Sequence, residues 1–477
     1  MSLIKSAKWN ALSQFFKIFI QLVNMVYLAT IIPPSEYGIM AMAAVVINLG
    51  VLLRDLGTAA AIIQRKSITD KLISSIFWLN IFIGVLLFFI VFSISPIISH
   101  LYNQEKLIPI LMLLSVNFPV SSSSSAHLAL LERDSKFKII SIIEIVSSLV
   151  SVILAVILAN IGFGVFSLVF QALLMSIVSS VLFWKYSRWR PIKWHKSMYQ
   201  ELKSIFGFSM NLSLFNIINY FSRNADSFII GKYMSASILG SYNLAYRIML
   251  FPLASLTFVF GRSLYPIMSR HQDDKNYIAS VYLNCIFYVL LFSAPLMSGI
   301  ALLSKPLILT VFGQQWILTS SILIWLAPTA ILQSVISTTG AVFNANGRTD
   351  ILLYLGIYGS LVQVTGFLIG VHGDIQYFAK CYFLANIINF FPPVTMALNL
   401  LGLKIRDLFF KIYPIVISNV IMVFSLYYLI KLDLLGFDNI KSLIFYPVIG
   451  SLIYSVVLII FSSNMREKFL LLLRGVK

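Results

Sequence analysis

The sequence predicts an all-α, polytopic membrane protein with fourteen transmembrane helices. Of its 477 residues, 59% are hydrophobic and only 11% are charged, whereas roughly 25% of the residues in a soluble domain are charged. The mean hydropathy is +0.92, and apolar runs near the ~20 residues that a helix needs to cross a bilayer recur along the chain. No loop between them has room for a soluble catalytic domain of about 50 residues. Any activity is therefore expected to reside in the helices.

Charge clusters and Pro or Gly turns divide the chain into the fourteen predicted spans. They cover approximately residues 11–32, 38–62, 72–94, 108–130, 139–159, 163–184, 205–228, 238–261, 278–302, 319–344, 351–371, 375–399, 411–430 and 442–461.

Lysine and arginine concentrate in one alternate set of the loops between these spans, and both termini belong to that set. This bias follows the positive-inside rule, which predicts cytoplasmic termini and an even number of spans. The net charge of +18 then reflects topology and not nucleic-acid binding. A full-length apolar run follows Lys5 and Lys8, so we expect no cleaved signal. The opposite set of loops contains only Lys106, Lys232, Lys305, Lys431 and Lys441.

An internal repeat is visible in two polar stripes on otherwise apolar helices. The stripes lie 202 residues apart, and the same offset relates Gly38 to Gly240. Each has the spacing 3, 4, 3, which keeps four side chains on one helix face. The stripes are Gln14, Lys17, Gln21 and Asn24 in the first span, and Asn216, Asn219, Arg223 and Asp226 in the seventh.

The repeat predicts two parallel six-helix lobes, an arrangement used by transporters that bind substrate between their halves. We assign residues 1–184 to the first lobe and residues 205–400 to the second. Residues 185–204 form a basic cytoplasmic linker whose tryptophans are typical of the headgroup layer. Residues 401–477 carry spans 13 and 14 and the cytoplasmic tail.

Eight ionisable residues lie within or near the spans, where a lipid-facing charge costs at least ~2.5 kcal/mol. They are expected to face the interior or a wet cavity. Lys17 and Arg247 have no acidic neighbour in their own helices and are candidates for binding an anion, whereas Arg223 and Asp226 have the spacing of a local ion pair. Asp55, Glu144 and Asp226 are candidates for ion coupling. The eight residues are Lys17, Arg54, Asp55, Glu144, Arg223, Asp226, Arg247 and Lys380.

Other chemistry has little support in the sequence. Cys285 and Cys381 both fall in predicted helices and are interpreted as packing residues, which leaves no zinc site or disulfide framework. No phosphate-binding Gly-Lys-Ser/Thr motif occurs. We therefore predict no catalytic residue, no metal and no cofactor, and expect uphill work to use an H⁺ or Na⁺ gradient.

Several motifs, taken in order and spacing, resemble the Wzx-like polysaccharide flippases, and in particular their colanic-acid-exporter-like branch within the multidrug/oligosaccharidyl-lipid/polysaccharide exporter superfamily. The resemblance covers essentially the whole chain. It rests on Tyr37-Gly38-Ile39-Met40, Asp55-Leu56-Gly57, Ile63-Gln64, Arg223-Asn224-Ala225-Asp226-Ser227-Phe228-Ile229-Ile230-Gly231-Lys232, Leu239-Gly240-Ser241-Tyr242-Asn243-Leu244-Ala245-Tyr246-Arg247 and Pro252.

The resemblance implies a bacterial inner-membrane flippase that moves undecaprenyl-diphosphate-linked oligosaccharide outward by alternating access, for O-antigen, capsule or exopolysaccharide assembly. It implies membrane lipids, a polysaccharide polymerase and chain-length machinery as partners, and a lipid-tail shelter at spans 13 and 14. The chain lacks the arginine-rich first helix of the lipid II flippases. The implied cavity residues are Lys17, Gln21, Asn24, Arg54, Asn219, Arg223, Arg247 and Lys380.

Two other functions stay open. A multidrug efflux antiporter of the same superfamily would share the fold plan, but a cationic cavity repels cationic drugs. A membrane-embedded polysaccharide polymerase or glycosyltransferase would need catalytic residues on sizeable outer loops, and the outer loops here are short, with few acids beyond Glu36 and Glu105.

Overall fold

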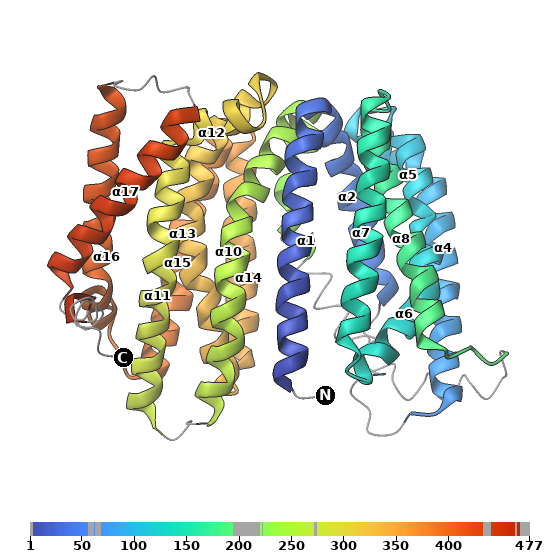
Figure 1. The fold of residues 1–477 in the computed structure, drawn as a ribbon, viewed down its shortest axis with the longest axis horizontal. Helices are drawn as coiled ribbons and strands as arrows, with labels where there is room; N and C mark the ends of the chain where they lie inside the picture. Colours follow the sequence, from blue (N-terminus) through green and yellow to red (C-terminus); the bar gives the residue numbers. More distant parts are fainter. Residues whose placement is uncertain are drawn as a thin grey trace. The chain divides into compact units, whose positions relative to one another are not determined.

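Helices make up the secondary structure of the part of the chain that the structure describes (Figure 1). The structure is a computed structural model and describes residues 3–55, 62, 68–193, 220–221, 223–270, 274–432, 440–462 and 465–467. By their contacts these residues belong to two compact units, Met1–Gly240 and Ser241–Lys477.

In the first unit, long helices pack side by side, with α7 against α1 and α8, and α6 against α4 and α8 (Figure 1). Local signals set the helix ends. The Thr69 hydroxyl accepts a hydrogen bond from the Leu72 amide at the start of α4 (3.1 Å), and Asn103 ends α4 in the left-handed conformation. The helices are α1 (Leu3–Ile31), α2 (Pro34–Asp55), α4 (Asp70–Tyr102), α5 (Leu107–Ser115), α6 (Asn117–Arg133), α7 (Phe137–Asn160) and α8 (Val165–Ser187), followed by helical residues 223–233 and the start of α10 (Ala236–Arg270).

One predicted span is divided. Residues 108–130 were expected to form a single helix, but α5 and α6 meet at Val116. Pro119 explains the interruption, because proline has no amide hydrogen to donate to the Ser115 carbonyl and its ring crowds that carbonyl. The two helices together remain long and apolar enough to cross a membrane.

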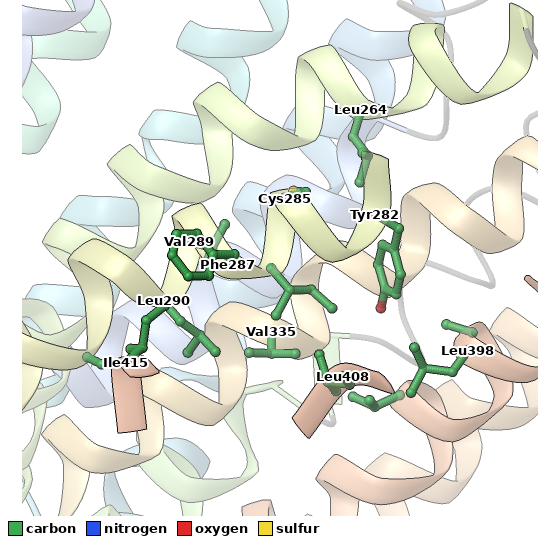
Figure 2. Packing of buried hydrophobic residues seen from close by; sticks show 14 of the residues in the cluster. Leu264, Tyr282, Cys285, Phe287, Val289, Leu290, Val335, Leu398, Leu408 and Ile415 are labelled. Carbon is green, nitrogen blue, oxygen red and sulfur yellow. The ribbon is translucent and has the colours of Figure 1, made fainter. Parts of the chain in front are cut away.

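The second unit has its apolar core between α11, α13, α15, α16 and α17. Figure 2 shows Leu290 of α11 near Val335 of α13 and Ile415 of α16, within a cluster that also contains Cys285. Cys285 and Cys381 are both buried, which confirms their interpretation as packing residues. The helices are α11 (Lys275–Leu302), α12 (Ser304–Val311), the short 3₁₀ helix η1 (Gln314–Trp316), α13 (Ile317–Ala345), α14 (Thr349–Gly370), α15 (Ile375–Leu400), α16 (Ile405–Lys431) and α17 (Ile440–Phe461).

Eleven helical stretches in the described residues are long and apolar enough to cross a membrane. The 29-residue α1 and the 35-residue α10 are further long helices. The protein is thus a multi-pass membrane protein. The compact units are defined by contacts and the predicted lobes by topology, so the lobe and linker boundaries stay a prediction.

Two glycines allow α2 and the first turns of α10 to approach backbone to backbone within the first unit. A Cβ atom at Gly38 would overlap the carbonyl of Ala236, and one at Gly240 would overlap the carbonyl of Pro34. Gly38 and Gly240 are the pair related by the repeat offset, and the same offset relates Pro34 to Ala236. The crossing is therefore reciprocal between equivalent positions of the repeat.

Candidate functional site

A polar stripe on α6 is the best-defined polar feature among the predicted spans of the first unit. Asn117, Ser121 and Ser125 follow one another four residues apart and so share one helix face. The Arg54 guanidinium, in the last turn of α2, donates to the Ser121 hydroxyl. The Asn80 amide of α4 donates to the Ser125 hydroxyl (2.9 Å). Three helices thus contribute polar side chains to this stripe.

Tight packing brings α2 and α4 close to the stripe. A Cβ atom at Gly50 of α2 would overlap the Phe118 ring, and one at Gly84 of α4 would overlap the Ser122 hydroxyl. The Asn117 side-chain oxygen is buried and accepts no hydrogen bond from the residues that the structure describes. Sequence reasoning missed the stripe, although five consecutive serines, Ser121–Ser125, inside an apolar span could have pointed to it.

The polar stripe of α1 is only partly described. Gln21 is exposed, and the Asn24 amide donates to the Gln171 side-chain oxygen of α8 (3.4 Å). Further along the same helix, the Asn160 amide of α7 donates to the Tyr27 hydroxyl (3.0 Å). The side chain of Lys17 lies outside the described residues.

The helix that contains residues 223–233 carries one exposed cation and one buried acid. The Arg223 side chain is exposed, whereas Asp226 is 5% exposed and its carboxylate accepts a hydrogen bond from the Ser227 amide (2.6 Å). This helix packs within the first unit, because the Phe228 ring contacts Tyr102 of α4 at 5.8 Å between centroids. Asn219 lies outside the described residues.

Arg247 and Lys380 both project from the surface of the second unit. On α10, Tyr242, Ala245 and Met249 are buried while Arg247 is exposed, so the arginine occupies the other face of the helix. On α15, the exposed Lys380 places its ammonium nitrogen 5.3 Å from the centroid of the Trp325 ring, a cation–π contact.

The three candidates for ion coupling differ in their surroundings. Glu144 on α7 is half-buried and lies within electrostatic range of Glu132, in the last turn of α6. Asp226 is buried, and the side chain of Asp55 lies outside the described residues. Glu132 lies just beyond the predicted span 108–130, because α6 continues to Arg133. Within the described part of the chain, no group of three His, Cys, Asp or Glu residues gathers as metal ligands.

Many long apolar helices that carry scattered cationic and amide side chains are typical of a membrane transport protein. The chain belongs to the family described as "Polysaccharide biosynthesis protein", whose model matches residues 27–321.

Two relatives named for polysaccharide assembly are similar over most of the chain. The teichuronic acid biosynthesis protein TuaB of Bacillus subtilis is 27% identical, covering 81% of this chain and 80% of the relative. The lipopolysaccharide biosynthesis protein WzxC of Escherichia coli is also 27% identical, covering 77% and 75%.

A solved structure of the lipid II flippase MurJ in an inward closed conformation has the same fold. It superposes with a TM-score of 0.73 at 18% identity and covers 96% of this chain and 99% of MurJ. The family match and the named relatives confirm the resemblance to polysaccharide flippases and their superfamily. The chain groups with flippases and transporters rather than with enzymes.

Proposed function

We propose that the chain is a flippase that moves an undecaprenyl-diphosphate-linked oligosaccharide from the cytoplasmic to the outer leaflet of the bacterial inner membrane. One observation carries the proposal: long apolar helices that carry several cations occur on a MurJ-like fold in a polysaccharide biosynthesis family. A diphosphate is the anion that such cations would bind, and the oligosaccharide would occupy the polar surroundings.

The proposed division of labour follows from side-chain chemistry. Arginine offers a planar, bidentate fork to phosphate oxygens, whereas lysine acts as a point charge. We assign phosphate contacts to Lys17, Arg54, Arg223, Arg247 and Lys380. The amides of Gln21, Asn24 and Asn219 suit sugar hydroxyls, because an amide both donates and accepts hydrogen bonds.

The polyprenyl tail is proposed to stay in lipid beside α16 and α17. In support, α16 carries an apolar groove of about 320 Å³. Such a surface contacts acyl or prenyl chains without desolvating polar groups. The groove is lined by Phe409, Phe410, Tyr413, Val416 and Ile417.

The proposed topology has fourteen spans, two parallel six-helix lobes, two C-terminal helices and cytoplasmic termini. Eleven candidate spans, together with α1, α10 and the helix that contains residues 223–233, support this number. The reciprocal contacts of Gly38 and Gly240 support the repeat. We also propose that a polymerase and chain-length machinery receive the product.

Transport is proposed to be coupled to H⁺ or Na⁺ through Asp55, Glu144 or Asp226. Buried or half-buried carboxylates can gain and lose a cation as their surroundings change, which is the property that coupling needs. Vesicles with an imposed Na⁺ or pH gradient would test this. If the transport rate is the same with and without each gradient, the proposed coupling is wrong.

The two alternatives make different predictions. A drug antiporter would expel a cationic dye against an ion gradient, and a polymerase or glycosyltransferase would lengthen a lipid-linked sugar chain in detergent. Two relatives that match most of the chain are named for teichuronic acid and lipopolysaccharide biosynthesis. Their names favour a flippase over a drug antiporter.

A complementation experiment tests the proposal in cells that lack their own exporter. We expect the chain to restore surface polysaccharide and Arg247→Gln to abolish it at unchanged protein abundance. Arg270→Gln is the matched control, because Arg270 is an exposed arginine in the last turn of the same helix. Normal polysaccharide with Arg247→Gln and Arg223→Gln would refute the assigned site.

A further inference from the structure

The residues that follow α8 do not leave the helix bundle at once. Arg188 adopts the left-handed conformation (φ 56°) and ends the helix, and residues 188–193, here called the strap, run along the N-terminal end of α4. The Ile192 amide donates to the Ser74 hydroxyl (3.0 Å), and the Trp78 indole donates to the Ile192 carbonyl (2.8 Å). Both main-chain groups of Ile192 are therefore held by α4.

Two tryptophans of this stretch, Trp184 and Trp189, donate hydrogen bonds to residues of the neighbouring helices. The Trp189 indole donates to the Asp70 carboxylate at the start of α4 (3.3 Å). The Trp184 indole donates to the Ser123 carbonyl of α6 (2.8 Å). Both rings also contact Phe77 edge-on, at 6.0 and 5.9 Å between centroids.

His127 of α6 lies at the centre of these rings and is 0% exposed. Its Nδ1 atom is 2.6 Å from the Ser187 hydroxyl at the end of α8. Its ring centroid lies 4.4 Å from that of Trp184 and 5.3 Å from that of Trp189. The strap residue Trp189 thus covers a buried polar side chain, which undocking would expose.

Arg190 holds the strap from its outer side. Its guanidinium lies 5.4 Å from the centroid of the Trp184 ring and donates to the carbonyls of Trp184 (3.0 Å) and Trp189 (2.7 Å). The strap is therefore fixed by directed hydrogen bonds to α4, by ring contacts with α4 and α6, and by its own arginine.

We propose that the strap is a docking segment that stays fixed to α4, α6 and α8 during transport. This inference rests on the proposed flippase function. Its physical basis is that undocking breaks several oriented hydrogen bonds and uncovers Ser74 and His127, both 0% exposed. Within the predicted linker, the described residues 185–193 thus comprise the end of α8 and the docked strap.

Labelling of a buried position tests the docking. In a chain with Cys285→Ala and Cys381→Ala, a Ser74→Cys variant is alkylated in membranes by a water-soluble maleimide. We expect slow labelling, little changed by Trp189→Phe and at least about tenfold faster with Trp189→Ala, which removes the ring. A Thr69→Cys variant is the control, because Thr69 is exposed and should label rapidly in every background. Equal, rapid labelling at positions 69 and 74 in the parent would overturn docking.

A cross-link tests whether the strap stays docked during transport. Ser74→Cys and Ile192→Cys are joined by a short bis-methanethiosulfonate, and leaflet exchange of lipid-linked oligosaccharide is measured in vesicles. We expect efficient cross-linking with at least half of the exchange rate retained. Loss of exchange that a reductant restores would show that the strap must release. If the parent chain exchanges no substrate while position 74 stays protected, the proposed function fails and docking stands.

Discussion

At the scale of residues, Arg54 differs from the other described candidate cations. Its guanidinium is partly buried and bonded to Ser121, whereas Arg223, Arg247 and Lys380 have exposed side chains. A cation in the last turn of α2 also interacts favourably with the helix dipole. Arg54 therefore has one role in α2 that needs no ligand and a second, proposed role in binding phosphate, which substitutions can separate.

The charge of Arg54 and its hydrogen bond to Ser121 can be removed separately, and their effects on leaflet exchange can be compared. Arg54→Gln should slow leaflet exchange about tenfold or more, since a hydrogen bond to a charged group contributes ~1.5–3 kcal/mol and ~1.4 kcal/mol is a factor of ten. Arg54→Lys should retain part of the rate. Ser121→Ala is the control and should stay within about twofold of the parent. A loss with Ser121→Ala as large as with Arg54→Gln would make the role of Arg54 structural.

At the scale of elements, apolar runs were sufficient to locate the helices, because a membrane helix must satisfy its own backbone and leave apolar side chains outside. Pro119 lies within the predicted span 108–130, but that single span did not allow for the break that a proline causes inside a helix. The contact between Arg54 and Ser121 joins two helices distant in sequence, and nothing in the local pattern specifies such pairs. Trp184 and Trp189 lie in a stretch whose composition is typical of the headgroup layer. Their hydrogen-bond acceptors are Ser123 on α6 and Asp70 on α4, which are distant in sequence, so the local pattern does not identify them.

The glycine crossing of α2 and α10 gives a prediction about stability. Gly38→Ala and Gly240→Ala should each destabilise the protein by about 1–3 kcal/mol, the usual cost of overpacking, because the added methyl would overlap a backbone carbonyl. Gly299→Ala on α11 is the matched control, since nothing lies within 4 Å of its added Cβ. It should be neutral or stabilising by up to about 1 kcal/mol.

Thermal unfolding in detergent measures these differences. The two crossing variants should melt clearly below the parent and the control at or above it. Equal melting temperatures for all three variants would show that the backbones are not in close approach.

At the scale of the whole molecule, the predicted repeat pairs equivalent glycines but unequal charges. Gly38 and Gly240 occupy equivalent positions and make reciprocal contacts. The candidate cations are not equivalent, because Lys17 corresponds to Asn219 and Arg223 to Gln21 at the same offset. We propose that the two repeats carry unequal sets of charges, which would suit a diphosphate that moves along a path better than one fixed site.

The central claim is outward movement of a diphosphate-linked oligosaccharide, and leaflet exchange by the purified protein in vesicles measures it most directly. Labelled undecaprenyl-diphosphate oligosaccharide is incorporated, and the fraction of sugar open to a membrane-impermeant reagent is followed with time. We predict that the protected fraction falls toward zero with the parent protein and about tenfold more slowly with Arg54→Gln. A protected fraction that stays at the level of protein-free vesicles would contradict the account.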